Sequence, residues 1–425
     1  MKKIGVALLG VGTVGGGTYQ ILTSKREYLK ETQGLDIEVL HVLEKNIMRT
    51  RELGIADEIV SCDIENIIKN PDISIVCEFF GGIEPAKTFL IKSLEAGKSI
   101  VTANKELFSK YWAELEKAAK KGNAGLYFEA SCVGGVPIIR TITEGLQANK
   151  ILGIQGIING TTNYILSNMS DNGVAYEDAL REAQKLGYAE ADPTADVEGY
   201  DAMYKISILS TLAYHKRLPI EKVYREGMSK ISIDDINYGK ELGYTLKLLA
   251  ISKNINNKLE ARVHPAFVKN SNPLATVKGS FNAVLLKGDS VGDIMLYGRG
   301  AGDLPTGSAI VSDIIYAANR EQPMNYVINE TSDSDFNEDF LCQYYIRLSV
   351  VDKAGNFANI ATVLGNHNVS ISQVIQKHTD DATNCVPIII VTHLTRENDI
   401  QNAMKELLDM DSVVTAVDAL IRVAK

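Results

Sequence analysis

Short apolar runs alternate with longer amphipathic stretches along the first 130 residues of the chain. Runs typical of buried strands lie at residues 4–9, 37–43, 73–79, 99–102 and 126–129. Helical patterns lie between them, from the end of the first run to about residue 29 and over residues 84–96 and 105–121. Strands that alternate with helices form βαβ units, so this region predicts an α/β fold with a parallel sheet covered on both faces.

The pattern changes after about residue 135. A strand is expected at residues 152–158, helices at 176–186 and 198–214, and short strand-like pieces over 260–300. This mixture predicts a second, α+β domain over residues 136–299. A helical pattern at residues 305–318 predicts a return to the first domain, which we therefore assign to residues 1–135 together with 300–320.

The last hundred residues have a third pattern. Residues 321–340 are polar and acidic with little apolar periodicity, so we expect a linker there. Residues 341–425 predict a small βαββαβ domain. Its expected strands are 344–351, 371–377, 386–392 and 413–419, and its expected helices are 356–366 and 397–410.

Composition narrows the class of protein. The 425 residues carry 44 basic and 53 acidic side chains, a formal charge of −9. Such a chain lacks the basic surface that unspecific binding to nucleic acids or anionic membranes requires. No apolar run approaches the roughly 18 residues that span a bilayer, and glycines interrupt the one run that follows the N-terminal lysines. Five cysteines form no CxxC pair, so we expect a reducing, cytoplasmic location and no metal knuckle.

A glycine fingerprint follows the first predicted strand directly. It comprises Gly10, Gly12, Thr13, Val14 and Gly15, and it opens the first helix. In this position the glycines permit a tight turn, a close approach to a pyrophosphate and close packing of helix on strand. The amides at the start of the helix then hold the phosphate charge. The sequence therefore predicts a Rossmann-like domain that binds NAD(P).

The residues that select between the two cofactors give conflicting signals. An acidic residue at the end of the second strand favours a free ribose hydroxyl, and a basic residue favours a 2′-phosphate. Glu44 and Lys45 are adjacent at this point. The preference between NAD and NADP stays open.

Lysines paired with carboxylates are the candidates for proton transfer. The chain has six histidines and no HExxH motif, which speaks against zinc chemistry. Asp201 and Lys205 lie four residues apart on a predicted helix and share one face, either as a surface ion pair or as an active-site face. Lys105 directly follows a predicted parallel strand, where ligands bind, or it faces water at a helix start.

Several segments together resemble one family, homoserine dehydrogenase. The segments, which occur in the family's order over residues 1–320, are GVGTVG at 10–15, EFFGGIEPA at 78–86, VTANKEL at 101–107, FEASCVGGVPII at 128–139, INGTTNYIL at 158–166, GYAEADPTADVEGYDAMYK at 187–205 and YGRGAGDLPTGSAIVSD at 297–313. The resemblance implies interconversion of L-homoserine and L-aspartate 4-semialdehyde with NAD(P), in the biosynthesis of threonine, methionine and isoleucine.

The resemblance also implies roles for individual residues. The two functional lysines of the family fall on Lys205, as acid/base, and Lys105, which orients the substrate oxygen and contacts the cofactor; these two roles could be exchanged. Residues implied to bind substrate are Glu190, Asp201 and Asp196. Residues implied to surround the cofactor are Gly81, Gly82, Thr102, Gly187 and Gly302. For acid/base work near neutrality a lysine pKa must fall by about 3 units from ~10.4, which burial favours and Asp201 opposes.

A monovalent cation, usually sodium, is a further implication of the resemblance. The implied ligands are the Glu129 carboxylate and backbone carbonyls at Cys132, Gly134 and Val136. Carbonyl ligands suit a hard cation whatever the side chain is. A nucleophilic Cys132 is a rival interpretation that lacks an activating histidine.

The tail resembles an ACT domain, a small-molecule sensor. Residues 352–358 resemble the loop before its first helix, with Ala354 in place of the usual proline. Family precedent implies feedback by threonine, although an ACT unit that only dimerises stays an alternative. A homodimer or homotetramer is expected, with no kinase segment fused ahead of residue 1. Two rival functions are another dinucleotide-linked dehydrogenase and a sensor with an inactive site.

Overall fold

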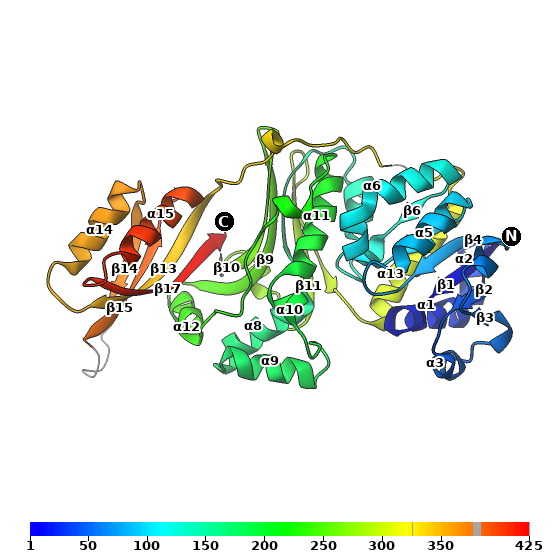
Figure 1. Ribbon diagram of the computed structural model, residues 1–425, viewed down its shortest axis with the longest axis horizontal. Helices are drawn as coiled ribbons and strands as arrows, with labels where there is room; N and C mark the ends of the chain where they lie inside the picture. Colours follow the sequence, from blue (N-terminus) through cyan, green and yellow to red (C-terminus); the bar gives the residue numbers. More distant parts are fainter. Residues whose placement is uncertain (325, 377–383, 425) are drawn as a thin grey trace.

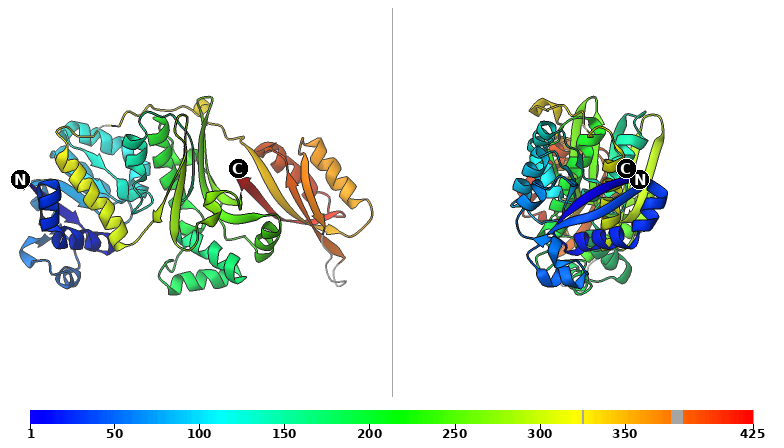
Figure 2. Two further views of the ribbon diagram at one scale, coloured as in Figure 1. Left: turned by 180° about the vertical axis from the view of Figure 1, so that it is seen from behind. Right: turned by 90° about the vertical axis from the view of Figure 1, so that its right-hand side faces the viewer.

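Three regions follow one another along an elongated molecule (Figure 1). The computed structural model describes residues 1–324, 326–376 and 384–424. The N-terminal region lies at one end, the tail at the other, and the middle region lies between them, as the left view of Figure 2 also shows. The elements follow the order of the predicted domains, and the domain limits themselves stay a prediction. No helix in these described ranges is long and apolar enough to cross a membrane.

The N-terminal sheet is parallel throughout and has the strand order β3-β2-β1-β4-β5-β6. The expected alternation is confirmed, because each strand is a short apolar segment followed by a helix. The strands are β1 (Lys2–Leu9), β2 (Leu35–Leu43), β3 (Val60–Ser61), β4 (Ile73–Glu78), β5 (Ser99–Thr102) and β6 (Leu126–Tyr127). The strand order reverses between β1 and β4, and ligands bind at such a point, outside the carboxyl ends of the strands.

Helices cover both faces of this sheet, and one of them returns from far along the chain. The helices are α1 (Thr13–Ser24), α2 (Arg26–Gln33), α3 (Ile47–Glu52), α4 (Glu65–Ile68), α5 (Ala86–Glu95), α6 (Lys105–Gly122) and α13 (Asp303–Asn319). Helix α13 packs on α1 at Gly17, where a Cβ would lie 2.4 Å from the carbonyl oxygen of Asp303. The predicted return helix therefore lies on the first region because glycine allows the two backbones to meet.

The middle region and the tail share one sheet, with the order β12-β11-β7-β9-β10-β17-β13-β15-β14. The middle strands are β7 (Ile151–Ile157), β8 (Tyr224–Arg225), β9 (Tyr244–Ile255), β10 (Lys258–Lys269), β11 (Phe281–Gly288) and β12 (Gly292–Arg299). Its helices are α7 (Ile138–Arg140), α8 (Gly160–Asn172), α9 (Tyr176–Lys185), α10 (Thr194–Val197), α11 (Tyr200–Tyr214) and α12 (Ile233–Glu241). Short 3-10 or π turns occupy Asp57–Ile59, Glu129–Ser131, Thr141–Gly145, Ile220–Lys222, Pro273–Thr276 and Asp333–Asp335.

The expectation of only short strand-like pieces over residues 260–300 is wrong. Strand β10 forms a long antiparallel hairpin with β9, paired from Lys258 with Ile255 to Lys269 with Tyr244. The sequence pattern did not indicate the full strand β10, because it contains the charged residues Glu260 and Arg262. Both are buried and bonded to each other inside the protein. Helices α8 and α12 were not anticipated either, since glycine and asparagine interrupt their apolar periodicity.

The tail has the expected βαββαβ order. Its elements are β13 (Leu341–Val351), α14 (Asn356–Asn366), β14 (Ile371–Gln376), β15 (Cys385–Thr392), β16 (Thr395–Arg396), α15 (Glu397–Leu408) and β17 (Val414–Ala424). Residue 377, the end of one predicted strand, lies outside the described residues. Strand β17 runs five residues beyond its predicted end and pairs in parallel with β10, Ala266 opposite Arg422.

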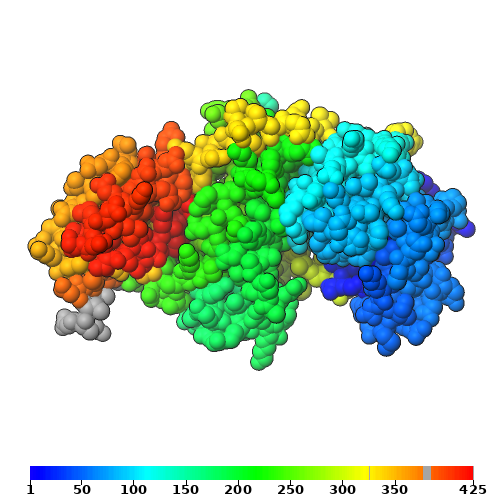
Figure 3. Space-filling view, viewed as in Figure 1, coloured from blue at the N-terminus to red at the C-terminus, as the bar shows by residue number. Residues whose placement is uncertain are grey.

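The predicted linker is held against the protein surface. It crosses the top of the middle region as the yellow segment in Figure 3. Asn329 bridges to Lys216 and Phe336 to Leu259, and the ring of Tyr326 lies 5.9 Å from that of Trp112. This segment is therefore a strap that joins all three regions.

A buried ion network joins the tail to the middle region. Arg422 on β17 is 1% exposed and contacts Glu397 and Glu226 at 2.6 Å each. Its Nη2 also donates to the hydroxyl oxygen of Tyr224, at 2.8 Å. Tyr344 donates its hydroxyl to Glu397 at 2.7 Å. These bonds satisfy groups that are costly to leave unpaired in a buried position.

We expect Arg422→Met to lower the free energy of unfolding by about 3–5 kcal/mol, because Glu397 would be left as a buried charge without its partner. Urea denaturation of the full chain measures this loss. The double variant Arg422→Met/Glu397→Gln should recover part of the stability, since it removes the stranded charge. A loss below about 1 kcal/mol, the range of exposed pairs, would contradict the assignment.

Candidate active site

The glycine turn has the shape that a dinucleotide requires. Gly10 has a φ of +94°, and a Cβ on Gly15 would lie 2.2 Å from the Gly10 carbonyl oxygen. At Gly12 a Cβ would meet no described atom within 4 Å, so the space in front of the N-terminus of α1 is open. Thr13 and Val14 begin that helix, with no acidic residue in its first turn. The turn therefore fits a pyrophosphate held by backbone amides.

At the end of β2, the carboxylate expected to bind the cofactor ribose is bonded to the backbone of the protein. The Glu44 carboxylate accepts backbone N–H bonds from Val11 at 3.0 Å and from Lys45 and Asn46 at 2.9 Å each. Lys45 is exposed. Arg49 was not among the site residues predicted from the sequence; its Nε donates to the Val11 carbonyl at 3.2 Å, directly beside the glycine turn. A cationic side chain, which also pairs with Glu52 at 3.1 Å, thus stands beside the glycine turn.

Two lysines from different regions meet at one carboxylate. Lys205 Nζ lies 2.6 Å from one oxygen of Asp201, and Lys105 Nζ lies 3.2 Å from the other. Lys205 also donates to the Ile158 carbonyl at 2.8 Å. Lys105 begins α6, while Asp201 and Lys205 lie one turn apart on α11. The interpretation of Asp201 and Lys205 as a surface ion pair is wrong, because both are buried.

The charges of this cluster determine its proton affinities. Burial opposes ionisation of Asp201, but the charges of Lys205 and Lys105 outweigh it and hold the Asp201 pKa well below its usual range. In return, the charge of Asp201 raises the pKa of Lys105 although burial opposes it. The fall in pKa that the sequence argument required is therefore not found for Lys105, which stays a cation.

Asn159 bridges two carboxylates of the cluster. Its Nδ2 donates to Asp196 at 2.7 Å and to Asp201 at 2.9 Å. Its Oδ1 caps α8 by accepting from the amide of Thr162 at 2.9 Å. Burial, and then the charge of Asp201, raise the Asp196 pKa. Sequence reasoning missed Asn159, although an asparagine before Gly-Thr-Thr is a helix-capping signal.

Other predicted residues lie on loops around the cluster. Glu190 is exposed on the loop between α9 and α10, where its carbonyl accepts from Gln184 at 3.1 Å. Gly187 follows α9 two residues after its last residue and has a φ of +78°, and Gly302 precedes α13 with a φ of +122°. No described contact brings these three residues to the lysines.

The loops after β4 and β5 are bonded to each other. The Gly82 carbonyl accepts from Asn104 Nδ2 at 2.8 Å, and Gly82 has a φ of +76°. A Cβ on Gly81 would meet no described atom within 4 Å, so this loop faces open space. Thr102, the last residue of β5, is fully buried. These residues therefore border the same sheet edge as Lys105.

The predicted cation loop has strained backbone. Val133 and Gly134 have φ values of +57° and +51°, and this region is unfavourable for a β-branched residue. The Glu129 carboxylate accepts from the amides of Ile139 at 2.7 Å and Arg140 at 2.9 Å, and burial raises its pKa to about 7. Among the described residues no group of three His, Cys, Asp or Glu side chains could hold a metal.

Two more candidates on this loop can be placed. Val136 is buried beside the loop, and its amide donates to the Val133 carbonyl at 3.0 Å. Cys132 is fully buried, and burial raises the pKa of its thiol to about 12. A thiol with that pKa is not a nucleophile at neutral pH.

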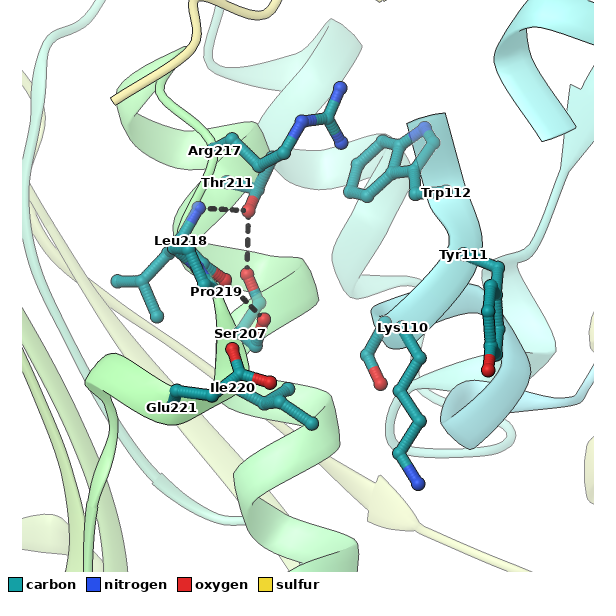
Figure 4. Close-up of a pocket in the computed structure, with 11 residues that line it drawn as sticks. Lys110, Tyr111, Trp112, Ser207, Thr211, Arg217, Leu218, Pro219, Ile220 and Glu221 are labelled. Atoms are coloured by element: carbon teal, nitrogen blue, oxygen red, sulfur yellow. Dashed lines mark hydrogen bonds between the residues drawn. The ribbon is translucent and has the colours of Figure 1, made fainter. Parts of the chain in front are cut away.

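A separate cavity of about 330 Å³ lies between α6 and α11, further along these helices than Lys105 and Lys205 (Figure 4). Lys110, Trp112 and Arg217 line it, and Ser207 and Thr211 face it from α11. The hydroxyls of Ser207 and Thr211 are bonded within the wall, to the Leu218 carbonyl at 2.6 Å and to the Ser207 carbonyl at 2.8 Å. The proton-transfer candidates do not line this cavity.

Comparisons with known proteins agree with this arrangement. The family models "Homoserine dehydrogenase, NAD binding domain", "Homoserine dehydrogenase" and "ACT domain" match residues 10–129, 137–315 and 344–411. Homoserine dehydrogenase of Bacillus subtilis is 38% identical and the match covers 100% of this chain and 99% of that protein.

Solved structures give the same answer. A homoserine dehydrogenase from Thiobacillus denitrificans superposes with a TM-score of 0.93 at 38% identity, covering 100% of this chain and 99% of that one. A hyperthermophilic archaeal homoserine dehydrogenase in complex with NADPH gives 0.65 at 27% identity, covering 76% of this chain and 100% of that one. The chain therefore belongs to the homoserine dehydrogenase family of oxidoreductases, with a nicotinamide-binding region and a C-terminal ACT domain.

Proposed function

We propose that the Asp201 cluster is the site at which L-aspartate 4-semialdehyde is reduced to L-homoserine, in threonine, methionine and isoleucine biosynthesis. The single observation that carries this proposal is the meeting of Lys105 from the nucleotide-binding region with Asp201 and Lys205 from the middle region. A substrate between these groups would contact both the cofactor side and the proton donors.

The proposed mechanism assigns one task to each group. When bound, the nicotinamide supplies the hydride for the aldehyde carbon. Lys205 Nζ gives its proton to the aldehyde oxygen, and Lys105, kept cationic by Asp201, holds that oxygen as its negative charge develops. Asp196 and Glu190 pair with the substrate ammonium, and for Glu190 this requires its exposed loop to close over the site. In the oxidative direction the Lys205 ammonium would first lose a proton.

We further propose that NADP(H) is accepted. Both Glu44 oxygens already bind backbone amides, so this carboxylate is poorly placed to take ribose hydroxyls. Arg49 offers positive charge beside the turn, and the exposed Lys45 follows the end of β2; such charge suits a 2′-phosphate. The NADPH complex of the archaeal relative supports this preference by likeness.

We also propose a monovalent cation, with sodium as the expected ion. Two amides already occupy the Glu129 carboxylate, so the backbone carbonyls of Cys132, Gly134 and Val136 would supply most of the ligands. The strained turn at Val133 supports the proposal, since such backbone is retained where the surroundings require it. Replacing sodium by a bulky organic cation should then lower turnover.

For the tail we propose feedback by threonine through the ACT domain, in a cytoplasmic homodimer or homotetramer. The ACT match supports an amino-acid effector, and the shared sheet gives it a direct connection to the middle region. Threonine should lower the rate of homoserine oxidation. An unchanged rate at saturating threonine would favour the alternative of a tail that only dimerises.

We expect Lys205→Ala to reduce turnover of L-homoserine with NADP by roughly 10²–10⁴-fold, the usual contribution of a positioned acid or base. Cofactor affinity should change little, because Lys205 lies on the middle region. Initial rates and cofactor titration measure both quantities. Lys117→Ala, an exposed lysine on α6, is the control and should keep wild-type turnover. Near-normal turnover of Lys205→Ala would show that another group moves the proton.

We expect Arg49→Gln to raise the KM for NADP by roughly tenfold, the equivalent of about 1.4 kcal/mol. The KM for NAD should stay within about twofold, because NAD lacks the 2′-phosphate that we place beside this guanidinium. Steady-state rates with each cofactor separate the two effects. An equal rise for both cofactors would mean that Arg49 only supports the glycine turn.

A further inference from the structure

A buried carboxylate stands at the reversal point of the N-terminal sheet. Glu78 is the last residue of β4, is 0% exposed, and lies opposite Thr102, the last residue of β5. The Thr102 hydroxyl donates to one carboxylate oxygen at 2.5 Å, and Asn104 Nδ2 approaches the other at 3.4 Å. Within the part of the chain that the structure describes, no lysine, arginine or histidine forms an ion pair with this carboxylate, so hydrogen bonds are what stabilise it.

The bonds continue from Glu78 to the residue before Lys105. The Thr102 hydroxyl accepts from the amide of Asn104 at 3.0 Å. Asn104 in turn caps α6, since its Oδ1 accepts from the amide of Leu107 at 3.1 Å. The same Asn104 side chain donates to the carbonyls of Phe80 at 3.2 Å and Gly82 at 2.8 Å. One network therefore determines both the start of α6 and the course of the loop after β4.

We infer that Glu78 is a positioning residue of the reaction: it acts through Thr102 and Asn104 to place Lys105 and the Gly81–Gly82 loop beside the nicotinamide. The inference rests on the proposed active site, because it concerns how Lys105 reaches it. A displacement of about 1 Å at such a group is enough to lower a rate by 10²-fold.

The chemistry of the network explains why a carboxylate stands here. Both oxygens of Glu78 face donors, so the position needs an acceptor on each side. Glutamine of the same shape would turn one N–H₂ group toward a donor and leave a buried group unpaired. Burial raises the Glu78 pKa to about 7 against these hydrogen bonds. The charged form of Glu78 therefore lowers the stability of the fold. Its contribution to the protein is the position that it gives to Thr102 and Asn104.

Glu78→Gln tests the inference, beginning from wild-type turnover of L-homoserine with NADP. We expect kcat to fall by roughly 10–100-fold. The KM for the dinucleotide should rise, while the affinity for ADP-ribose, which lacks nicotinamide, should stay within twofold. Lys98→Met is the matched control, because Lys98 bonds the Ile73 carbonyl at the opposite end of β4, at 2.8 Å, and should affect only stability.

A coupling measurement separates positioning from general damage. In a Lys105→Ala background, Glu78→Gln should lower kcat by a smaller factor than in the otherwise unchanged enzyme, since one of the two groups that it positions is gone. An undiminished loss in that background, or an equal loss of ADP-ribose affinity, would overturn the inference. If Glu78→Gln does not fold, Thr102→Val, which removes the hydroxyl bonds to Glu78 and to the Asn104 amide, is measured in the same way. Absent wild-type turnover would instead contradict the proposed function.

Discussion

The attraction of one buried carboxylate for two lysines is the constraint on which the rest of the molecule depends. Asp201 lies on α11, one lysine lies on the same helix, and the other begins α6 in a different region of the chain. In a buried site an unpaired charge is far more costly than in water. Asp201 is already paired with Lys205 on its own helix, so its second pairing, with Lys105, is what joins the two regions at the charged ends of α6 and α11.

The tail is connected to the region that carries Asp201 by strand pairing, by the strap and by a buried ion network. Strand β17 pairs with β10, the strap crosses the middle region, and Arg422 is bonded to residues from both sides. Helix α11 packs on β9 and β10 of the same sheet. The edge strand of the ACT sheet is hydrogen-bonded to the sheet that supports Asp201 and Lys205, so the tail and the cluster are joined by continuous structure.

The sequence pattern predicted the N-terminal sheet, whose strands and turns depend on residues close together in the chain. Glycines at 10, 12 and 15 and the alternation of apolar runs gave the nucleotide-binding sheet, because turn geometry and burial act over a few residues. The β9–β10 hairpin was not predicted, since its charged residues Glu260 and Arg262 can be buried only because they form a hydrogen bond with each other in the folded protein. Arg49 and Asn159 were not predicted either, because their partners Val11 and Asp196 are distant in the sequence and come close only in the folded chain. The resemblance found Lys105 and Lys205, while spacing alone left both undecided.

The electrostatics of the cluster also bear on the direction of the chemistry. With Asp201 raising its pKa, Lys105 is a cation at neutral pH and suits an oxygen that gains negative charge, as in aldehyde reduction. A substrate ammonium near Asp196 and Asp201 would compete with the lysines for the same carboxylate. Each added positive charge makes a lysine proton easier to release. Binding of a substrate ammonium would therefore weaken the pairing of Asp201 with Lys105, which is the interaction that raises the pKa of that lysine.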